Sequence, residues 1–265
     1  MSSGARPASA GDDAFAWFRQ KRWCAQYHPW AVAVLERILT PHLGPGASVL
    51  DLFCGAGAIT KALAALGYYV TGVDRSGALV DLARAEAPEA FFLEADARAF
   101  RMPLAFHGAV CAFEGLNRII APPELQTVFE NVWASLQPRG VFVFDMLLED
   151  AFLARWAETR AVVEDEHAFF IRAGYDPLER LGRTDFTVFR LAGGEWQRCD
   201  SALIERCYAP AEVRRMLLAA SFGAVRVVDA VRDLGIPGSP GEGRAFFVAL
   251  KSPGATRRRA ARSSI

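Results

Sequence analysis

The sequence predicts an α/β protein, a doubly wound seven-stranded sheet with an inserted small antiparallel lid. Two observations predict this class. Strand-like and helix-like stretches alternate up to Asp150, and three strand-like runs then follow one another before the alternation resumes. Strands that alternate with helices are typical of βαβ units in a parallel sheet, whereas consecutive strands favour an antiparallel meander.

The elements of the core follow from the spacing of apolar residues. A helix is expected over 29–43, where apolar residues recur at helical spacing until Gly44-Pro45-Gly46 ends it. The strands expected next are Ser48–Leu52, Tyr69–Asp74, Ala90–Glu94, Gly108–Phe113 and Gly140–Met146, and the helices between them are 58–66, 77–86 and 122–136. After the lid, a helix over Pro210–Ala220 and strands over Ala224–Ala230 and Ala245–Lys251 complete the sheet.

The lid is expected from three strand-like runs, H-A-F-F-I-R-A-G-Y, T-D-F-T-V-F-R-L and E-W-Q-R-C-D-S-A-L-I-E-R-C-Y. Because side chains alternate along a strand, one face of the first run carries His167, Phe169, Ile171 and Ala173, and the sequence leaves open which face covers the site. We divide the chain into a disordered N-terminus (1–12), a core (13–150), the lid (151–209), the C-terminal part of the core (210–251) and a disordered basic tail (252–265).

Composition excludes several classes of function. Lys and Arg number 30 and Asp and Glu also number 30, so the chain as a whole has no basic footprint for nucleic acid. The 5 cysteines show no C-x-x-C spacing, which disfavours a disulfide framework or a zinc cluster, and we expect no metal. No apolar run approaches the ~20 residues of a membrane span. We therefore expect a cytoplasmic protein without a membrane partner.

The stretch V-L-D-L-F-C-G-A-G-A-I-T, from Val49 to Thr60, indicates a ligand site. Gly55 and Gly57 allow the backbone to approach a ligand closely, although such a pair also occurs in plain tight turns. Asp51 would repel a pyrophosphate, and Thr60 stands where a dinucleotide loop has its third glycine. A carboxylate suits a ligand that carries an ammonium group, as S-adenosylmethionine does. The alternative is that Asp51 caps a turn or helix.

Two further acids stand at strand ends. Asp74 ends the second strand about 20 residues after the loop, where an acid accepts both ribose hydroxyls in nucleotide-binding sheets. Asp96 follows the third strand, where it can accept from an adenine amino group. Either acid alone is compatible with a solvated loop. Three acids at carboxyl ends of strands together predict a nucleotide site.

With these motifs the chain resembles the class I S-adenosylmethionine-dependent methyltransferases over roughly residues 25–250. V-L-D-L-F-C-G-A-G resembles the family's first motif, with Phe53 in place of its first glycine. The resemblance implies a Rossmann-like fold and S-adenosyl-L-methionine as cofactor. It also implies that Asp51, Cys54, Gly55 and Gly57 lie along the methionine moiety of the cofactor. Asp74, Arg75 and Ser76 would lie at the ribose, and Asp96 and Ala97 at the adenine.

The run F-H-G-A-V-C-A-F-E-G-L-N-R-I resembles the fourth strand of the same family. This implies that Glu114 and Gly115 flank the methyl-transfer site. Tyr27, just before the first helix, is expected to line the methionine end, as an aromatic residue does in small-molecule members. The chain departs from the family pattern at His107 and Arg139, where aspartate and glycine are common.

The acceptor is expected to be a small molecule. The run F-E-G-L stands where amino-methylating base enzymes carry [D/N]-P-P-[Y/F], and no cysteine follows a proline as in C5-cytosine enzymes. Methyl transfer is an in-line displacement, for which Glu114 and His167 are the candidate bases. We lean to nitrogen over oxygen as acceptor atom because no strong base is evident. The alternatives are an RNA or DNA base methyltransferase and a non-catalytic S-adenosylmethionine-binding partner module.

Overall fold

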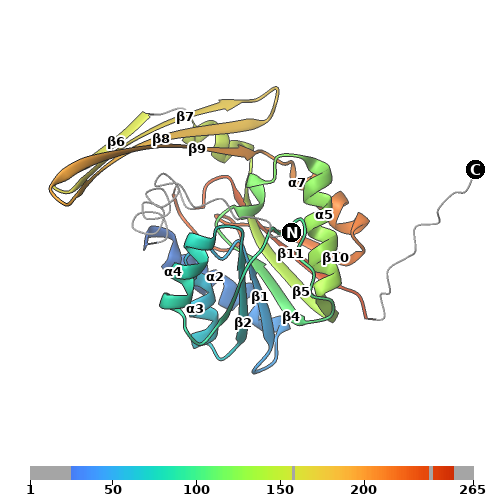
Figure 1. Ribbon diagram of the computed structural model, residues 1–265. Helices are drawn as coiled ribbons and strands as arrows, with labels where there is room; N and C mark the ends of the chain where they lie inside the picture. Colours follow the sequence, from blue (N-terminus) through green and yellow to red (C-terminus); the bar gives the residue numbers. More distant parts are fainter. Residues whose placement is uncertain (1–24, 157–158, 239–240, 254–265) are drawn as a thin grey trace, which may run out of the picture.

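The protein has two β-sheets, one in an α/β core and one that projects as an arm above it (Figure 1). The computed structural model describes residues 25–156, 159–238 and 241–253. The core sheet has seven strands in the order β10-β11-β5-β4-β1-β2-β3, and the arm has four in the order β6-β7-β8-β9. This confirms the predicted fold class, a Rossmann-like sheet with an antiparallel lid.

The core sheet reverses its strand order between β1 and β4. From β3 to β5 neighbouring strands are parallel, whereas β11 and β10 are antiparallel to their neighbours. In sheets of this kind ligands bind at the carboxyl ends of the strands where the order reverses. The strands are β1 (Ser48–Leu52), β2 (Tyr69–Asp74), β3 (Phe91–Glu94), β4 (Phe106–Cys111), β5 (Leu136–Leu147), β10 (Phe222–Asp229) and β11 (Arg244–Lys251).

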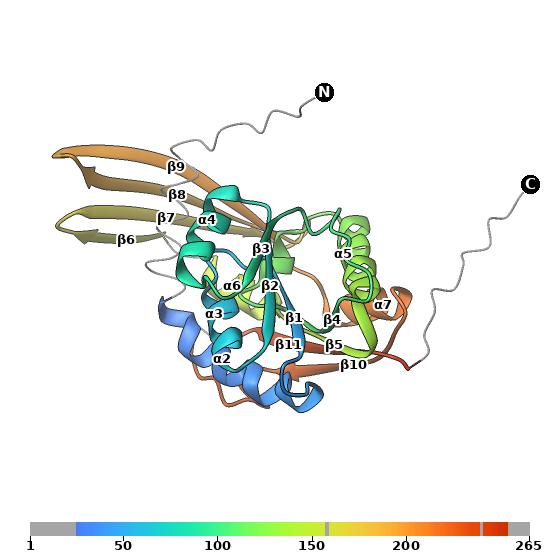
Figure 2. The same cartoon turned by 60° about the horizontal axis from the view of Figure 1, so that its bottom comes forward.

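Helices cover both faces of this sheet (Figure 2). The alternation along β5 shows why two layers are needed: Val141 and Val143 join one apolar cluster, and Phe142 and Phe144 join the other. A strand that is buried on both faces is a continuous apolar run in the sequence, and β5 was predicted from such a run. The helices are α2 (Ala25–Ile38), α3 (Ala58–Ala65), α4 (Gly77–Glu86), α5 (Pro122–Ser135) and α7 (Pro210–Ala219), with short 3-10 turns η2 (Thr40–His42) and η3 (Gly115–Arg118).

The lid has four antiparallel strands, so the prediction of three was wrong. They are β6 (Thr159–Glu164), β7 (His167–Asp176), β8 (Leu181–Ala192) and β9 (Glu195–Arg206). The sequence did not reveal β6 because it is an edge strand and five of its six residues are exposed, so it shows no alternation of buried and exposed positions. Phe169, Phe186 and Val188 are buried on the lid face that carries His167.

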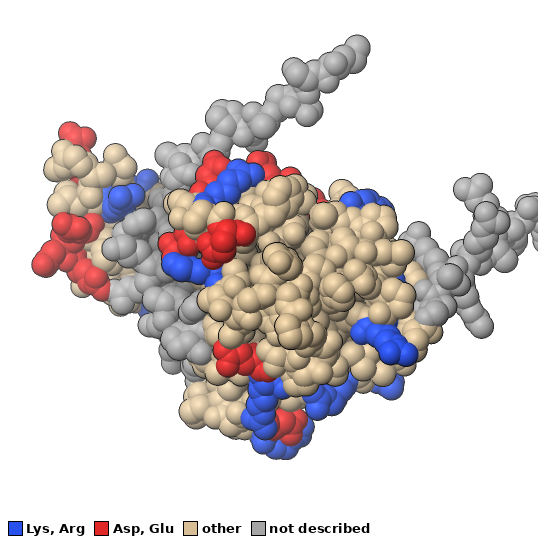
Figure 3. Space-filling view, turned by 90° about the horizontal axis from the view of Figure 1, so that it is seen from below, with Lys and Arg blue, Asp and Glu red and all other residues tan. Residues whose placement is uncertain are grey.

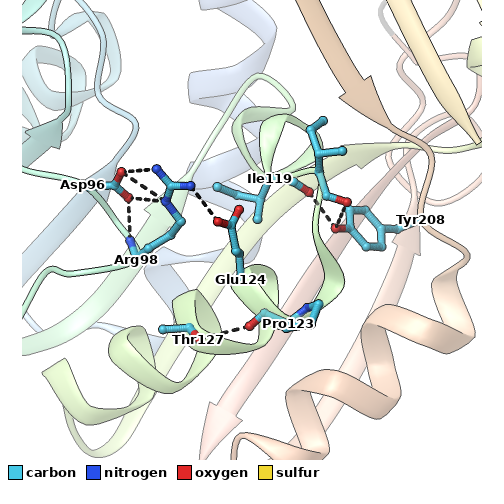
Figure 4. A network of polar contacts seen from close by, with 8 residues as sticks. Asp96, Arg98, Ile119, Pro123, Glu124, Thr127 and Tyr208 are labelled. Atoms are coloured by element: carbon cyan, nitrogen blue, oxygen red, sulfur yellow. Dashed lines mark hydrogen bonds and ion pairs between the residues drawn. The ribbon is translucent and has the colours of Figure 1, made fainter.

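The lid is fixed to the core at its root. Gly182 of β8 leaves so little room that a Cβ there would lie 2.7 Å from the ring of Phe152 in α6 (Glu149–Arg155). The buried Asn117 donates from Nδ2 to the carbonyls of Leu147 (3.1 Å) and Arg206 (2.8 Å). Just after β9, the Tyr208 hydroxyl donates to the Ile119 carbonyl at 2.6 Å (Figure 4). These contacts join β5, η3 and the lid into one packed joint.

The proposed end segments lie largely beyond what the structure describes, since residues 1–24 and 254–265 fall outside it. Within the described ranges, no helix combines the length and the apolar character that a bilayer crossing requires.

Candidate active site

A row of carboxylates crosses the carboxyl edge of the core sheet. In the order of the strands, Asp96 follows β3, Asp74 ends β2, Asp51 lies near the end of β1 and Glu114 follows β4. These four acids lie far apart in the sequence, and the parallel strands bring them to the same edge. The row spans the point where the strand order reverses, so the structure brings together the residues predicted for the nucleotide.

The glycine loop lies between β1 and α3 and contains strained backbone. Phe53 has a φ of 59°, in the left-handed region that favours glycine, which is the residue the family has there. Gly55 also has a positive φ, and the space where its Cβ would lie is open. At Gly57 a Cβ would lie 3.0 Å from the Cβ of Ala83. Gly55 therefore leaves room for a ligand, whereas Gly57 is required for the packing of the loop against α4.

Asp74 holds the glycine loop in place. Its carboxylate accepts from the Gly55 backbone N–H at 3.0 Å through Oδ2 and from the Ser76 N–H at 2.9 Å through Oδ1. Ser76 in turn caps α4 by accepting from Leu79 N. Each carboxylate oxygen has two lone pairs, so both oxygens of Asp74 retain capacity for hydroxyl donors. Arg75 is exposed beside this site.

Asp51 is a buried carboxylate tied to the following helix. Its side chain is 2% exposed and accepts from the Thr60 hydroxyl at 2.6 Å. Burial raises its pKa to about 7, although the hydrogen bond from Thr60 acts in the opposite direction. The bond to the Thr60 hydroxyl gives Asp51 a structural role as well, because it ties β1 to α3. A carboxylate with this pKa is stabilised in its charged form by any cation placed next to it.

Asp96 forms an ion pair with Arg98, which follows it by two residues (Figure 4). Arg98 contacts both carboxylate oxygens and also donates to Glu124 at 2.9 Å. The hydrogen bonds from Arg98 lower the pKa of Asp96, which keeps it ionised. The neighbouring Ala97 is buried, and its carbonyl accepts from the Asn131 side chain at 2.9 Å. The acid predicted at the adenine position thus belongs to a fixed ionic group.

Cys54 turns its side chain away from this edge. Its sulfur packs in an apolar cluster with residues of α4 and with Phe92, and it lies 3.0 Å from where a Cβ of Gly72 would be. Burial is the main cause that raises the pKa of this thiol well above its ordinary range. The backbone of Cys54 belongs to the glycine loop, and its carbonyl accepts from Gly57 N at 3.0 Å.

Glu114 is part of a buried ionic cluster with Asp145 and Arg244. The Arg244 guanidinium is fully buried, contacts Asp145 and lies 2.7 Å from Glu114 Oε2. The Glu114 backbone N–H donates to Asp145 Oδ2 at 3.1 Å, and Glu114 adopts a φ of 48°. Although burial acts to raise the pKa of Glu114, the charges of Arg244, Arg155 and Arg118 hold it below its usual value. Glu114 is therefore an ionised acceptor, 18% exposed, at the end of β4.

Three residues of this site, Asp145, Arg244 and Trp30, were not predicted from the sequence. Asp145 was visible as the one acid in the apolar run V-F-V-F-D-M-L, a position that requires a buried cationic partner. Arg244 is that partner, and it lies almost 100 residues later, at the start of β11. The Trp30 ring covers the Arg244 guanidinium at 5.4 Å. Gly115, the predicted neighbour of Glu114, is buried, and a Cβ there would lie 2.8 Å from Cys111 Sγ.

The structure does not bring His167 to Glu114. His167 opens β7 and pairs with Arg190 near the end of β8, whereas Asp176 and Leu181 lie at the root of the lid. At ~3.3 Å per residue, this places His167 roughly 30 Å along the strand from the root. Its Nε2 lies 3.1 Å from Glu164. Tyr27 is in the first turn of α2, and its side chain lies outside what the structure describes.

Acidic and basic side chains are mixed on the surface. From the side opposite the lid, both kinds surround a broad uncharged area, and no continuous basic patch appears on that face (Figure 3). Among the described residues, no group of three or more His, Cys, Asp or Glu is placed to hold a metal ion.

The chemistry of these groups fits S-adenosylmethionine. Asp74 supplies acceptor capacity for a ribose diol, Gly55 leaves open space beside it, and the buried Asp51 suits a ligand with cationic groups. When bound, this cofactor supplies a methyl group on a sulfonium. Asp74, Gly55 and Asp51 would hold it, with Glu114 at the neighbouring strand end.

Comparisons with known proteins agree with this geometry. Residues 49–140 match the family of the methyltransferase domain. The chain is 28% identical over 211 residues to the putative methyltransferase YqeM of Bacillus subtilis, which covers 77% of this chain and 84% of that one.

Two solved structures share the fold at 20% identity each. One is an S-adenosylmethionine-dependent methyltransferase from Clostridium acetobutylicum (TM-score 0.77, covering 90% of this chain and 98% of that one). The other is CalS10 with bound S-adenosylmethionine, an amino pentose methyltransferase from Micromonospora echinaspora (TM-score 0.66, 94% and 100%). The matched domain shows that the chain is an S-adenosylmethionine-dependent methyltransferase, and its fold and the row of acids at its switch point are consistent with class I of these enzymes.

Proposed function

We propose that this enzyme transfers the methyl group to a nitrogen atom of a small-molecule amine. The observation that carries the proposal is the state of Glu114, an ionised carboxylate at the end of β4 that Arg244 holds in place. Such a carboxylate is a weak base, because its pKa lies below the ordinary value for Glu. It is a strong hydrogen-bond acceptor for an N–H group.

This state of Glu114 favours an amine over an alcohol. An alcohol benefits from a base that takes its proton, and a carboxylate with a lowered pKa is poorly suited to that task. An amine needs only to be neutral and to direct its lone pair along the line of displacement. Glu114 orients the amine by accepting one N–H, and alignment of this kind supplies a large part of catalysis in methyl transfer. The amino pentose methyltransferase CalS10, a structural neighbour, supports the same class of acceptor.

Two measurements test this function. The first is calorimetric titration with S-adenosylmethionine and S-adenosylhomocysteine, for which we expect micromolar binding that Asp74→Ala abolishes. The second offers radiolabelled cofactor with matched pairs of small amines and the corresponding alcohols, with tRNA and duplex DNA as further acceptors. We expect label on amines only. Label on the alcohols would reassign the acceptor atom, label on nucleic acid would reassign the substrate, and cofactor binding without any transfer would favour a non-catalytic binding module.

Glu114→Gln separates the role of charge from that of shape. Gln is nearly isosteric with Glu but has no negative charge to accept strongly from an amine. We expect transfer to amines to fall by about tenfold or more, in line with the loss of one charge-assisted hydrogen bond. The affinity for S-adenosylhomocysteine should stay within about twofold of the wild type. An equal loss of cofactor binding would place Glu114 at the cofactor instead of the acceptor.

A further inference from the structure

Arg118 is a half-buried cation beside the methyl-transfer site. It is the last residue of η3, the turn that Glu114 caps. Within the part of the chain that the structure describes, Arg118 forms neither a hydrogen bond nor an ion pair, and its Nε is buried without an acceptor. A guanidinium carries five N–H donors, and a buried donor without an acceptor costs free energy. The side chain is thus an anion-binding group that the protein itself does not use.

The element that carries Arg118 lies on the side of Glu114 away from the cofactor acids. Those acids stand at the ends of β3, β2 and β1, whereas η3 follows β4, which lies on the other side of β1. η3 is also joined to the root of the lid, because the side chain of Asn117 donates to the carbonyls of Leu147 and Arg206. The position of Arg118 therefore favours contact with the acceptor over contact with the nucleotide.

Glu114 and Arg118 are close enough to bind the two ends of one small molecule. At a rise of ~2.0 Å per residue, the four residues of 3-10 turn between them span about 8 Å. Burial acts to raise the pKa of both Glu114 and Cys111, and the charge of Arg118 acts to lower both. Cys111 ends β4, so this electrostatic effect agrees with a guanidinium near the end of that strand.

The neighbouring charges are already paired with one another. Arg244 contacts the carboxylates of both Glu114 and Asp145. Arg155, the third arginine whose charge acts on Glu114, donates to the Glu242 carbonyl at 3.2 Å. Arg118 differs from these two arginines because its donors are not engaged by any described residue. One guanidinium offsets one negative charge, which fits a carboxylate better than a doubly charged phosphate.

We propose that Arg118 determines acceptor specificity by binding a carboxylate of the methyl acceptor. The inference rests on the proposed function, because it takes the amine of that acceptor to lie at Glu114. The acceptor class is thus an amine with a carboxylate a few bonds away. Glu114 accepts an N–H of the amine, and Arg118 binds the carboxylate, for which a guanidinium offers two parallel N–H donors.

Calorimetric titration of the enzyme saturated with S-adenosylhomocysteine tests this site without methyl transfer. The probes are two matched pairs of different length, β-alanine with its carboxamide and para-aminomethylbenzoate with its carboxamide. We expect at least one acid to bind about tenfold more tightly than its amide, and Arg118→Gln to reduce that preference to about twofold or less. Equal affinities for acid and amide in both pairs would overturn the proposal.

Arg155→Gln is the matched variant, because Arg155 also acts on the charge of Glu114 but has a partner in the protein. It should change the affinity for acid and amide alike and keep the preference for the acid within about twofold of the wild type. An equal loss of preference in both variants would show a general effect of positive charge and would overturn a contact with Arg118.

The cofactor also carries a carboxylate, so its affinity is measured for the same variants. Arg118→Gln should bind S-adenosylhomocysteine within about twofold of the wild type, and a tenfold loss would assign Arg118 to the cofactor and overturn the proposal.

Methyl transfer then tests whether the bound acid is the acceptor. In the radiolabel assay, Arg118→Gln should lower the ratio of kcat/KM for acid over amide by about tenfold, and Arg118→Lys should restore part of it because the charge returns. An unchanged ratio would overturn the inference while the proposed function stands. If no amine accepts label from any variant, the proposed function fails, and the titrations still decide whether Arg118 binds a carboxylate.

Discussion

Asp51 offers a test in which stability and cofactor binding change in opposite directions. Its carboxylate is 2% exposed, and burial raises its pKa from an ordinary 3.8 to about 7. Above pH 7 the group is ionised in both the folded and the unfolded protein, and the folded protein bears the cost of the buried charge. As the pH falls below 7, the folded protein takes up a proton and this cost disappears. Asp51→Asn removes the charge and should stabilise the ligand-free protein above pH 7.

The size of the gain follows from the shift. About three pKa units at ~1.36 kcal/mol each give roughly 4 kcal/mol as an upper limit. Asn accepts from the Thr60 hydroxyl less strongly than a carboxylate does, and this reduces the gain in the free energy of unfolding by about 1 kcal/mol. We expect a net gain of about 2–3 kcal/mol at pH 8, or roughly 5–10 °C in Tm for a domain of this size. The affinity for S-adenosylmethionine should fall by about tenfold or more, because the cation then lacks its counter-charge.

Thermal unfolding at pH 8 and pH 5, with and without S-adenosylmethionine, measures both effects. The gain should be large at pH 8 and should shrink at pH 5, where Asp51 of the folded wild type is already protonated. Asp81→Asn is the control, since Asp81 is an exposed acid that pairs with Arg84 on α4, and it should change Tm little at either pH. A Tm for Asp51→Asn that is unchanged or lowered at pH 8 would refute the reasoning.

Three further changes test the frame around the site. Gly57→Ala should destabilise the fold by about 2 kcal/mol or more in urea denaturation, because its Cβ would meet Ala83 at a left-handed φ of 85°, and a loss under 0.5 kcal/mol would contradict this. Phe53→Gly should be about 1 kcal/mol more stable than Phe53→Ala, since both lack the ring and only glycine is unstrained at a φ of 59°; equal stabilities would argue against strain there. Asn117→Ala should cost about 3 kcal/mol and speed proteolysis within the lid, because it removes the buried donor to the Arg206 carbonyl, and unchanged cleavage would show that other contacts suffice.

Much of the fold was predictable because its signals are local. β1 and β2 were predicted with their observed bounds, since each is an apolar run between turn residues. The observed ends of β4 and β5 differ by a few residues from the predicted ends. Hydrogen bonding to a neighbouring strand decides where a strand stops, and a single sequence does not show that bonding. The lid strand β6 was missed for a related reason: an exposed edge strand needs no apolar face, so T-R-A-V-V-E has no periodic pattern.

The site was predictable only in part, and the division has a physical cause. Asp74 and Asp96 could be placed because parallel strands bring their carboxyl ends to one edge, so position along the chain fixes position in space. The direction in which a side chain points is fixed by packing instead, which is why Cys54 turned out to be a core residue and His167 to lie far along the lid. The role of Arg244 could not be predicted either, because it also depends on tertiary packing. Its role depends on the pairing of β11 with β5, which sets it beside Asp145 and Glu114, and nothing in the residues around Arg244 indicates that pairing. The Arg244 charge, which keeps Glu114 ionised and on which the proposal of an amine acceptor depends, could therefore be placed only from the tertiary structure. The sequence contained one indication of it, because Asp145 in the apolar strand β5 requires a cationic partner.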